Sequence, residues 1–147
     1  MRVALILLAL LAARPATGQM VQVSGVAVEL QIPILGAGYG TAVDTSTRLT
    51  WQGRQGDRHK ITVQSLVVGQ TYDLSVTAVG ARRGQAAGTV ALTAGMSPQD
   101  IVTNLPPGRW NANKIGEATL RYEASVPAGT VPSGEDVHRV IYTVTVQ

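Results

Sequence analysis

The chain has 147 residues, a formal net charge of +3, and neither cysteine nor phenylalanine. The lack of cysteine excludes disulfide bonds, thiol catalysis and cysteine-based metal sites. Charged residues make up 14% of the chain and are scattered along it, so the sequence gives no case for nucleic acid or an anionic membrane surface as a partner.

The first 18 residues have the pattern of a secretory signal peptide. A short basic start (residues 1–2) is followed by an apolar run at 3–13 ("VALILLALLAA") and by small residues at 16–18 ("ATG"). The apolar run is too short to span a bilayer, which takes about 20 residues. We expect cleavage after Gly18, which leaves residues 19–147 as a single domain.

Cleavage would also change the charge. Arg2 and Arg14 belong to the expected signal peptide, so ten Lys and Arg residues remain against nine Asp and Glu, a net charge of +1. The alternatives for residues 3–13 are an uncleaved membrane anchor and a core helix.

Alternation of apolar and polar residues recurs along the rest of the chain and indicates half-buried strands. The first such segment changes parity at Gly25, which predicts either a β-bulge or a strand that crosses between two sheets. Pro33 and the glycine-rich turn at 36–40 ("GAGYG") end this segment. Its apolar positions are Val21 and Val23 before the glycine, and Val26, Val28, Leu30 and Ile32 after it.

The middle of the chain predicts a hairpin, then a regular strand, then an irregular crossover. Residues 48–52 and 59–64 alternate on either side of "GRQGD" (53–57), which is a hairpin pattern. A strand over 71–78 follows, and after a polar turn at 80–88 the apolar face resumes. Ser, Pro and Asp at 97–100 resemble a helix cap and predict one helical turn or an irregular crossover over 98–104. The apolar positions are Leu49, Trp51, His59, Ile61, Val63, Tyr72, Leu74, Val76, Ala78, Val90 and Leu92.

Two further strands follow the loop at 106–116, and a Pro- and Gly-rich loop at 127–136 connects them. With them the chain has about seven to eight strands, each with one apolar and one polar face. This pattern predicts an all-β fold in which two antiparallel sheets pack as a β-sandwich. The apolar faces consist of Ala118, Leu120, Tyr122, Ala124 and Val126, and of His138, Val140, Tyr142, Val144 and Val146.

Candidate chemistry is sparse. Asp57 and His59, and likewise Asp136 and His138, are two residues apart and would share a face of a strand. Each pair supplies only two metal ligands, and we interpret each as a turn Asp beside a His at the start of a strand. No G-x-S-x-G motif occurs, and "GAGYG" lacks the spacing of a phosphate loop. We therefore expect no enzyme activity, no catalytic residues, no metal and no cofactor.

The candidate ligand-binding residues are aromatic. Trp110 lies in a loop beside Arg109 and Asn111, and it either stacks on a sugar or plugs the open end of the sandwich. Tyr39, in the glycine-rich turn, is a second anchor. Short basic loops at 53–60 and 81–84 either dock on acidic polymers or are solvated turns.

The end of the chain, "GEATLRYEASVPAGTVPSGEDVHRVIYTVTVQ" (116–147), resembles small secreted bacterial β-sandwiches of the immunoglobulin-like, pilin-like kind. Fimbrial subunits and spore-coat-U-type proteins belong to this group. The resemblance implies an immunoglobulin-like sandwich after a cleaved signal peptide. Members commonly carry a disulfide, which this chain lacks, and the resemblance supplies no site residues.

The resemblance also implies a function. We expect an exported structural or adhesive protein, a subunit of an extracellular appendage or coat, located in the periplasm or on the extracellular surface. The alternative is a monomeric secreted binding module that recognises a glycan or a protein through its end loops. The expected partners are further copies of the chain, another extracellular protein or a glycan, with no membrane span in the mature chain.

Overall fold

The computed structural model describes residues 5–7, 20–25, 27–36, 38–52, 57–107, 115–132 and 134–147, and the described part is all-β. Its strands are β1 (Leu5–Leu7), β2 (Met20–Ser24), β3 (Val28–Leu30), β4 (Ile34–Leu35), β5 (Gly38–Tyr39), β6 (Ala42–Gln52), β7 (His59–Leu66), β8 (Asp73–Arg82), β9 (Gln85–Ala86), β10 (Thr89–Ala91), β11 (Gln99–Leu105), β12 (Gly116–Ser125) and β13 (Val137–Val146). The prediction of seven to eight strands missed several short ones, because strands of two or three residues are too short to show alternation.

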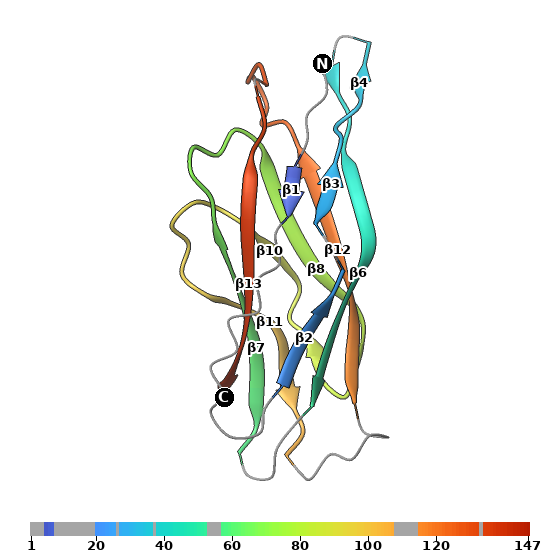
Figure 1. Ribbon diagram of the computed structural model, residues 1–147, viewed down its shortest axis with the longest axis vertical. Helices are drawn as coiled ribbons and strands as arrows, with labels where there is room; N and C mark the ends of the chain where they lie inside the picture. The colour runs from blue at the N-terminus through green and yellow to red at the C-terminus, as the bar shows by residue number, and fades with distance from the viewer. Residues whose placement is uncertain are drawn as a thin grey trace.

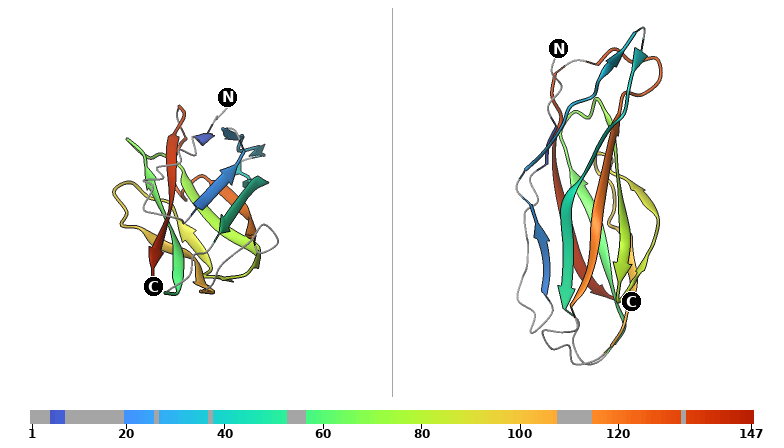
Figure 2. Two further views of the ribbon diagram at one scale, coloured as in Figure 1. Left: turned by 60° about the horizontal axis from the view of Figure 1, so that its bottom comes forward. Right: turned by 90° about the vertical axis from the view of Figure 1, so that its right-hand side faces the viewer.

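Two sheets face each other across one core (Figures 1 and 2). One has the order β3-β1-β13-β7-β11-β9 and the other the order β10-β8-β12-β6-β2, while β4 and β5 form a small separate hairpin. Neighbouring strands are antiparallel except β1 and β13, which are parallel. The prediction of an all-β fold with antiparallel sheets is therefore confirmed.

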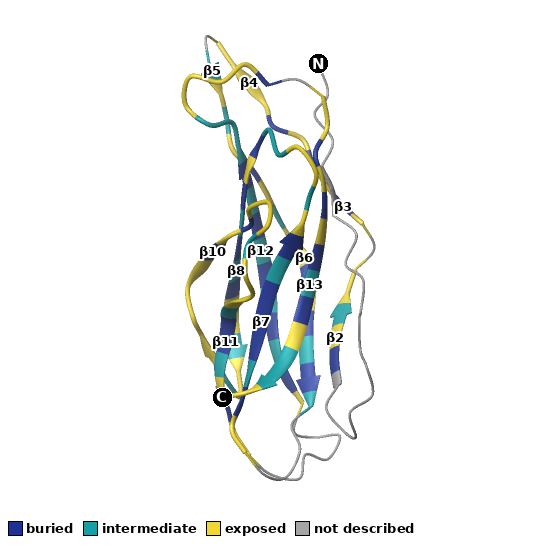
Figure 3. Cartoon of the chain, turned by 90° about the vertical axis from the view of Figure 1, so that its left-hand side faces the viewer, coloured by how far each residue is buried: buried dark blue, intermediate teal, exposed yellow. Residues whose placement is uncertain are grey.

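Most of the core consists of the predicted apolar faces, and Ile101, Val102 and Leu105 of β11 add to it without having been predicted (Figure 3). Trp51 is buried as predicted, and its Nε1 donates a hydrogen bond to the Arg83 carbonyl oxygen at 3.1 Å. Gly116 lies against the indole so closely that a Cβ there would be 2.0 Å from Trp51 Nε1. Fully buried side chains include Leu49, Ile61, Val63, Val76, Leu92, Ile101, Leu120, Tyr122 and Val140.

The predicted change at Gly25 is a crossing between sheets. The strand before it, β2, pairs with β6 in the five-stranded sheet, and the strand after it, β3, pairs with β1 in the six-stranded sheet. Gly25 has φ +137°, a conformation that side chains disfavour. Two residues of the second apolar set, Val28 and Leu30, are buried in β3, whereas Val26 lies outside the described residues.

The predicted hairpin between 48–52 and 59–64 is wrong. Both segments are strands, but β6 belongs to the five-stranded sheet and β7 to the six-stranded sheet. Alternation gives the buried face of a strand and not its pairing partner, so a connection between sheets has the same local pattern as a hairpin.

The predicted helical turn at 98–104 is also wrong, because this segment is strand β11. It pairs with β7 and β9, and Lys60 Nζ lies 2.8 Å from Asp100 Oδ1 across the pair. Pairing on both sides thus overrides the local cap signal, a weak preference. Two register shifts relative to β7 account for the irregular apolar pattern of the segment.

The last strand is buried over most of its predicted face but not at its end. His138, Val140 and Tyr142 are buried, Val144 is half-buried, and Val146 is 60% exposed. The prediction that Val146 completes the core is therefore wrong.

Candidate functional site: the side of the sandwich at strand β13

The predicted ligand-binding residues are not brought together in the described part of the structure. Arg109, Trp110 and Asn111 lie outside the described residues. Tyr39 is in β5 and is 42% exposed. The glycine-rich turn that contains it is part of the β4–β5 hairpin, in which Gly36 has φ +56°.

The hairpin has an apolar tip that sequence reasoning missed. Ile34 and Leu35 are 59% and 62% exposed, and they lie in β4, opposite Tyr39 and its neighbour in β5. The Gly40 N–H donates to the Pro33 carbonyl oxygen at 2.7 Å, which closes the base of the hairpin. Two large aliphatic residues directly before the glycine run could have signalled an apolar turn.

The two lateral sides of the sandwich differ in how their strand edges end. One side ends in β9 and β10, of two and three residues. Its longer neighbour β11 has two register shifts. Short and irregular edge strands are a common protection against pairing with another chain.

The other side contains β13, which is long and regular. Ten residues form the strand, and its pairing with β7 runs from Arg139 to Val146 without a register shift. It contains no proline and only one Arg or Lys, Arg139. On its side away from β7, the strand pairs within the described residues only with β1, at Val137 and His138.

Strand β1 lies between β13 and β3 (Figure 1). Ile6 and Leu7 pair with Val137 and His138 in parallel, and Leu5–Leu7 pair with Val28–Leu30 in antiparallel orientation. A segment of the expected signal peptide therefore supplies a strand of the six-stranded sheet. We call the strand position between β3 and β13 the seam.

A buried polar cluster lies at the β13 end of the seam. His138 is fully buried, and its Nδ1 is 2.9 Å from Ser65 Oγ. Its Nε2 has no hydrogen-bond partner among the described residues. Burial lowers the pKa of His138, against an opposing effect of the Asp136 carboxylate. The imidazole is therefore neutral near pH 7.

Asp136 is a structural anchor. The carboxylate is buried and accepts hydrogen bonds from the backbone N–H groups of Thr71 at 2.7 Å and Tyr72 at 2.8 Å. The Tyr72 hydroxyl donates to the Gly134 carbonyl oxygen at 3.0 Å. These bonds hold the 127–136 loop against the start of β8, in agreement with the interpretation of Asp136 as a turn Asp.

Burial, the Asp136 carboxylate and the Tyr39 phenol raise the pKa of Tyr72. The β4–β5 hairpin lies at the same end of the molecule as the start of β13 (Figures 1 and 3).

The cluster contains Ser, His and Asp but does not have the geometry of a catalytic site. Ser65 and His138 are fully buried, so no substrate reaches them in this conformation. Within the described residues no group of three or more His, Cys, Asp or Glu side chains could hold a metal ion. In the other predicted pair, Asp57 is exposed and His59 is buried, as a turn Asp beside a His at the start of a strand.

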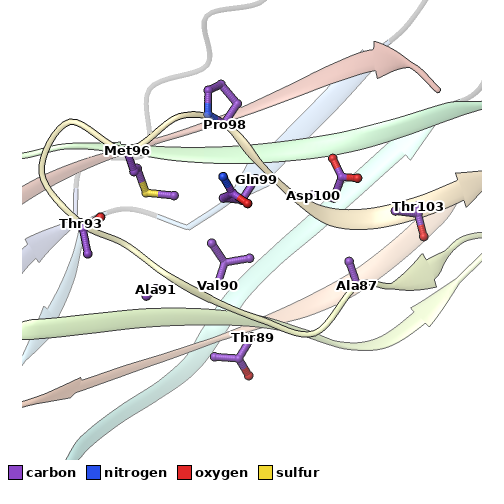
Figure 4. A pocket seen from close by; sticks show the side chains of 10 residues that line it. All are labelled: Ala87, Thr89, Val90, Ala91, Thr93, Met96, Pro98, Gln99, Asp100 and Thr103. Carbon is purple, nitrogen blue, oxygen red and sulfur yellow. The ribbon is translucent and has the colours of Figure 1, made fainter.

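A polar groove of about 750 Å³ lies between β10 and β11 (Figure 4). Val90 of β10 and Gln99 of β11 are on its opposite sides, and Asp100 is its only acidic residue. None of the predicted ligand-binding residues lines it. Because Asp100 is paired with Lys60, the groove offers no free charge to fix a ligand.

The described residues include no helix long and apolar enough to cross a membrane. No protein family, curated protein or solved structure matched the chain.

Proposed function

We propose that the protein is an exported structural or adhesive subunit of an extracellular appendage or coat. It acts by pairing its strand edges with other chains, without catalysis. The observation that carries this proposal is the regular edge of β13, next to a strand position that the expected signal peptide fills. Once the signal peptide is removed after export, the chain presents this edge to its partners.

The proposal includes an immunoglobulin-like arrangement of the strands. In such sandwiches one sheet has the order A-B-E-D and the other C-F-G. The series β2-β6-β12-β8 corresponds to A-B-E-D, and β7-β13-β1 corresponds to C-F-G. In this correspondence β1 has the position of the last strand, G, although it comes first in the sequence.

Electron microscopy of producing cells and of the purified exported protein tests the proposal. We expect mass spectrometry to show a chain that begins at Gln19, and we expect repeating fibres or a coat layer on the cells. A Leu8→Arg variant places a charge in the apolar run and should block export, so its cells serve as the control. Featureless particles with the mass of one chain would contradict the proposal.

A second candidate is a monomeric binding module, which the exposed hairpin tip favours. Ile34 and Tyr39 are exposed and paired across the hairpin, and Leu35 is exposed next to Ile34. Clustered exposed apolar residues mark interaction sites. Retention of the exported protein on a polysaccharide resin would support it. A Tyr39→Ala variant should then elute early, while a protein that only self-associates should be unaffected.

A further inference from the structure

We propose that one end of the sandwich binds an acidic polysaccharide through an exposed band of arginine and amide side chains. The inference goes beyond the proposed function, because it names a ligand and does not depend on assembly. The band crosses the outer face of the five-stranded sheet and continues around the β8–β9 turn to the start of β7. It consists of Arg48, Arg82, Arg83, Gln85, Asn104 and Arg58, all of which are exposed.

Charges that are scattered along the sequence are segregated in space. Within the described residues, the half of the sandwich with the β4–β5 hairpin and the start of β13 contains six acidic residues and two arginines, a formal charge of −4. The other half, where β13 ends, contains five basic and three acidic residues, a formal charge of +2 (Figure 1). The charged residues of the acidic half are Glu29, Asp44, Asp73, Glu123, Glu135 and Asp136, with Arg121 and Arg139.

Two arginines of the basic half share one carboxylate. Glu117 of β12 lies between them, with its Oε2 3.9 Å from Arg48 Nη1 of β6 and its Oε1 3.6 Å from Arg82 Nη1 of β8. One positive charge is therefore left over. The two arginine side chains are 67% and 78% exposed, so their remaining N–H groups are accessible to a ligand.

Two further arginines of this half are uncompensated. Arg58 and Arg83 form no ion pair within the described part of the chain. Of the remaining acidic residues here, Asp100 is paired with Lys60 and Asp57 is exposed. The band therefore attracts anions, and the acidic half repels them.

Amide side chains connect the two basic loops predicted at 81–84 and 53–60. Beyond Arg83, Asn104 Nδ2 donates to Gln85 Oε1 at 3.0 Å. Gln147 Oε1 accepts from the Asn104 backbone N–H at 3.0 Å, and the Gln147 N–H donates to the Arg58 carbonyl oxygen at 2.9 Å. The topology thus brings the two loops to one end of the molecule, with amide groups between their arginines.

This combination of side chains indicates the class of ligand. A guanidinium group binds a carboxylate through paired N–H donors. An amide side chain offers both donors and acceptors to hydroxyl groups. An acidic polysaccharide carries carboxylates and hydroxyls together, and an exposed band that spans several strands suits a polymer better than a small anion.

Other anionic partners fit the band less well. A bilayer surface is bound by basic and apolar groups on the same face. Here eight of the eleven large apolar side chains that are exposed in the described residues lie in the acidic half, among them Val68 at 98% and Val131 at 82%. The band also has no aromatic side chain on which a nucleic-acid base could stack.

A second copy would offer its acidic half to the band, but its shape is unfavourable. The β4–β5 hairpin projects from the acidic half (Figure 2), so it would meet the band first. Its exposed side chains Ile34 and Leu35 are apolar and offer no charge to the arginines.

The test measures binding of the purified full chain to immobilised polygalacturonate, with neutral dextran and poly-L-glutamate for comparison. We expect binding at about 50 mM salt that weakens steeply at about 300 mM, because the contacts are exposed and screened. Poly-L-glutamate has carboxylates without sugar hydroxyls and should bind more weakly, and dextran should not bind. Gln85→Ala should narrow the difference between the two acidic polymers.

The band is tested with two double variants that change the net charge equally. Arg58→Gln/Arg83→Gln should raise the Kd for polygalacturonate about tenfold. The matched control Arg121→Gln/Arg139→Gln removes two arginines of the acidic half and should change this Kd less than about twofold. Urea midpoints close to that of the wild type would show that both variants are folded.

Several results would overturn the inference. Equal weakening by both double variants would show that net charge alone attracts the polymer. Equal binding of polygalacturonate and poly-L-glutamate would remove the polysaccharide as the ligand, as would tighter binding of duplex DNA or of vesicles of phosphatidylcholine and phosphatidylglycerol. Association at low salt in light scattering that only Arg58→Gln/Arg83→Gln abolishes would identify a second copy as the partner of the band. None of these results would remove the proposed subunit function, which the microscopy of producing cells tests.

Discussion

The two lateral sides of this sandwich differ in how far the backbone groups at their strand edges are open to pairing with another chain. At the β9–β10 side the strands are short and β11 is irregular, so few backbone groups line up for another chain. At the β13 side a regular strand of ten residues ends beside a seam that a separate N-terminal segment fills. Since unpaired strand edges promote association, the difference supports the proposal that partners bind at the β13 side.

The largest expected effect comes from removing β13. Deletion of residues 138–147 removes the buried side chains of Val140 and Tyr142, worth about 1.5–3 kcal/mol each, and the strand between β7 and the seam. We expect the domain to unfold, seen as loss of the β-sheet circular dichroism spectrum. The control variant weakens the edge strand on the other side, because Gln85 and Ala86 of β9 are both replaced with glycine. This variant should stay folded. An equal loss of the circular dichroism spectrum in both variants would contradict the expected difference between the two sides.

The sequence predicted the buried faces well and the pairing of the strands poorly. Alternation is local, so it identified the core faces of β8 and β12, and at Gly25 it predicted either a bulge or the crossing that the structure has. Pairing depends on residues far apart in the chain, and for this reason β6 and β7 were wrongly joined as a hairpin.

The candidate site was hardest to predict. The sequence identified Tyr39, Asp136 and His138 as polar or aromatic residues of interest, but it did not show that they gather at one end of the sandwich. The apolar run at 3–13 has the composition of a signal peptide, and nothing in that composition indicates that part of it pairs with β3 and β13. To predict the seam, one would have to know how three segments that are far apart in the sequence pair with one another.

The next largest effect on stability is expected at the centre of the five-stranded sheet, away from both lateral sides of the sandwich. Gly116→Ala would place a methyl group against the Trp51 indole, and overpacking of this kind costs about 1–3 kcal/mol. Urea denaturation should show the loss as a lower midpoint with an unchanged slope. Gly38→Ala is the matched control, since a Cβ there would meet nothing closer than the Leu35 carbonyl oxygen at 3.8 Å. An unchanged midpoint for Gly116→Ala would show that Trp51 can move.

The pH dependence of stability should report on the β13 side. Burial lowers the pKa of His138 in the folded state, whereas the unfolded chain has the ordinary value near 6.5. Below that value the unfolded state binds a proton that the folded state does not, so stability is fully present above pH 6.5 and falls as the pH decreases. The loss is at most about 1.4 kcal/mol per pH unit between the two pKa values.

Urea midpoints measured from about pH 7.5 to about pH 5 check this dependence. A His138→Gln variant should have a lower midpoint throughout and a flatter dependence on pH in this range. If wild type and variant lose stability in parallel, other groups are responsible.

The two substitutions with the smallest expected effect on stability give the sharpest test of whether the β13 side or the β9–β10 side contacts partners. Thr143→Lys on β13 and Ala86→Lys on β9 both alter exposed positions, so each should change the free energy of unfolding by less than about 0.5 kcal/mol. Because lysine on an edge strand discourages pairing with another chain, Thr143→Lys should reduce association of the processed protein in light scattering. Ala86→Lys should leave association unchanged, since its side of the sandwich is already short and irregular. A reduction by Ala86→Lys alone would place the contact on the β9–β10 side, and the long edge of β13 would then need another explanation.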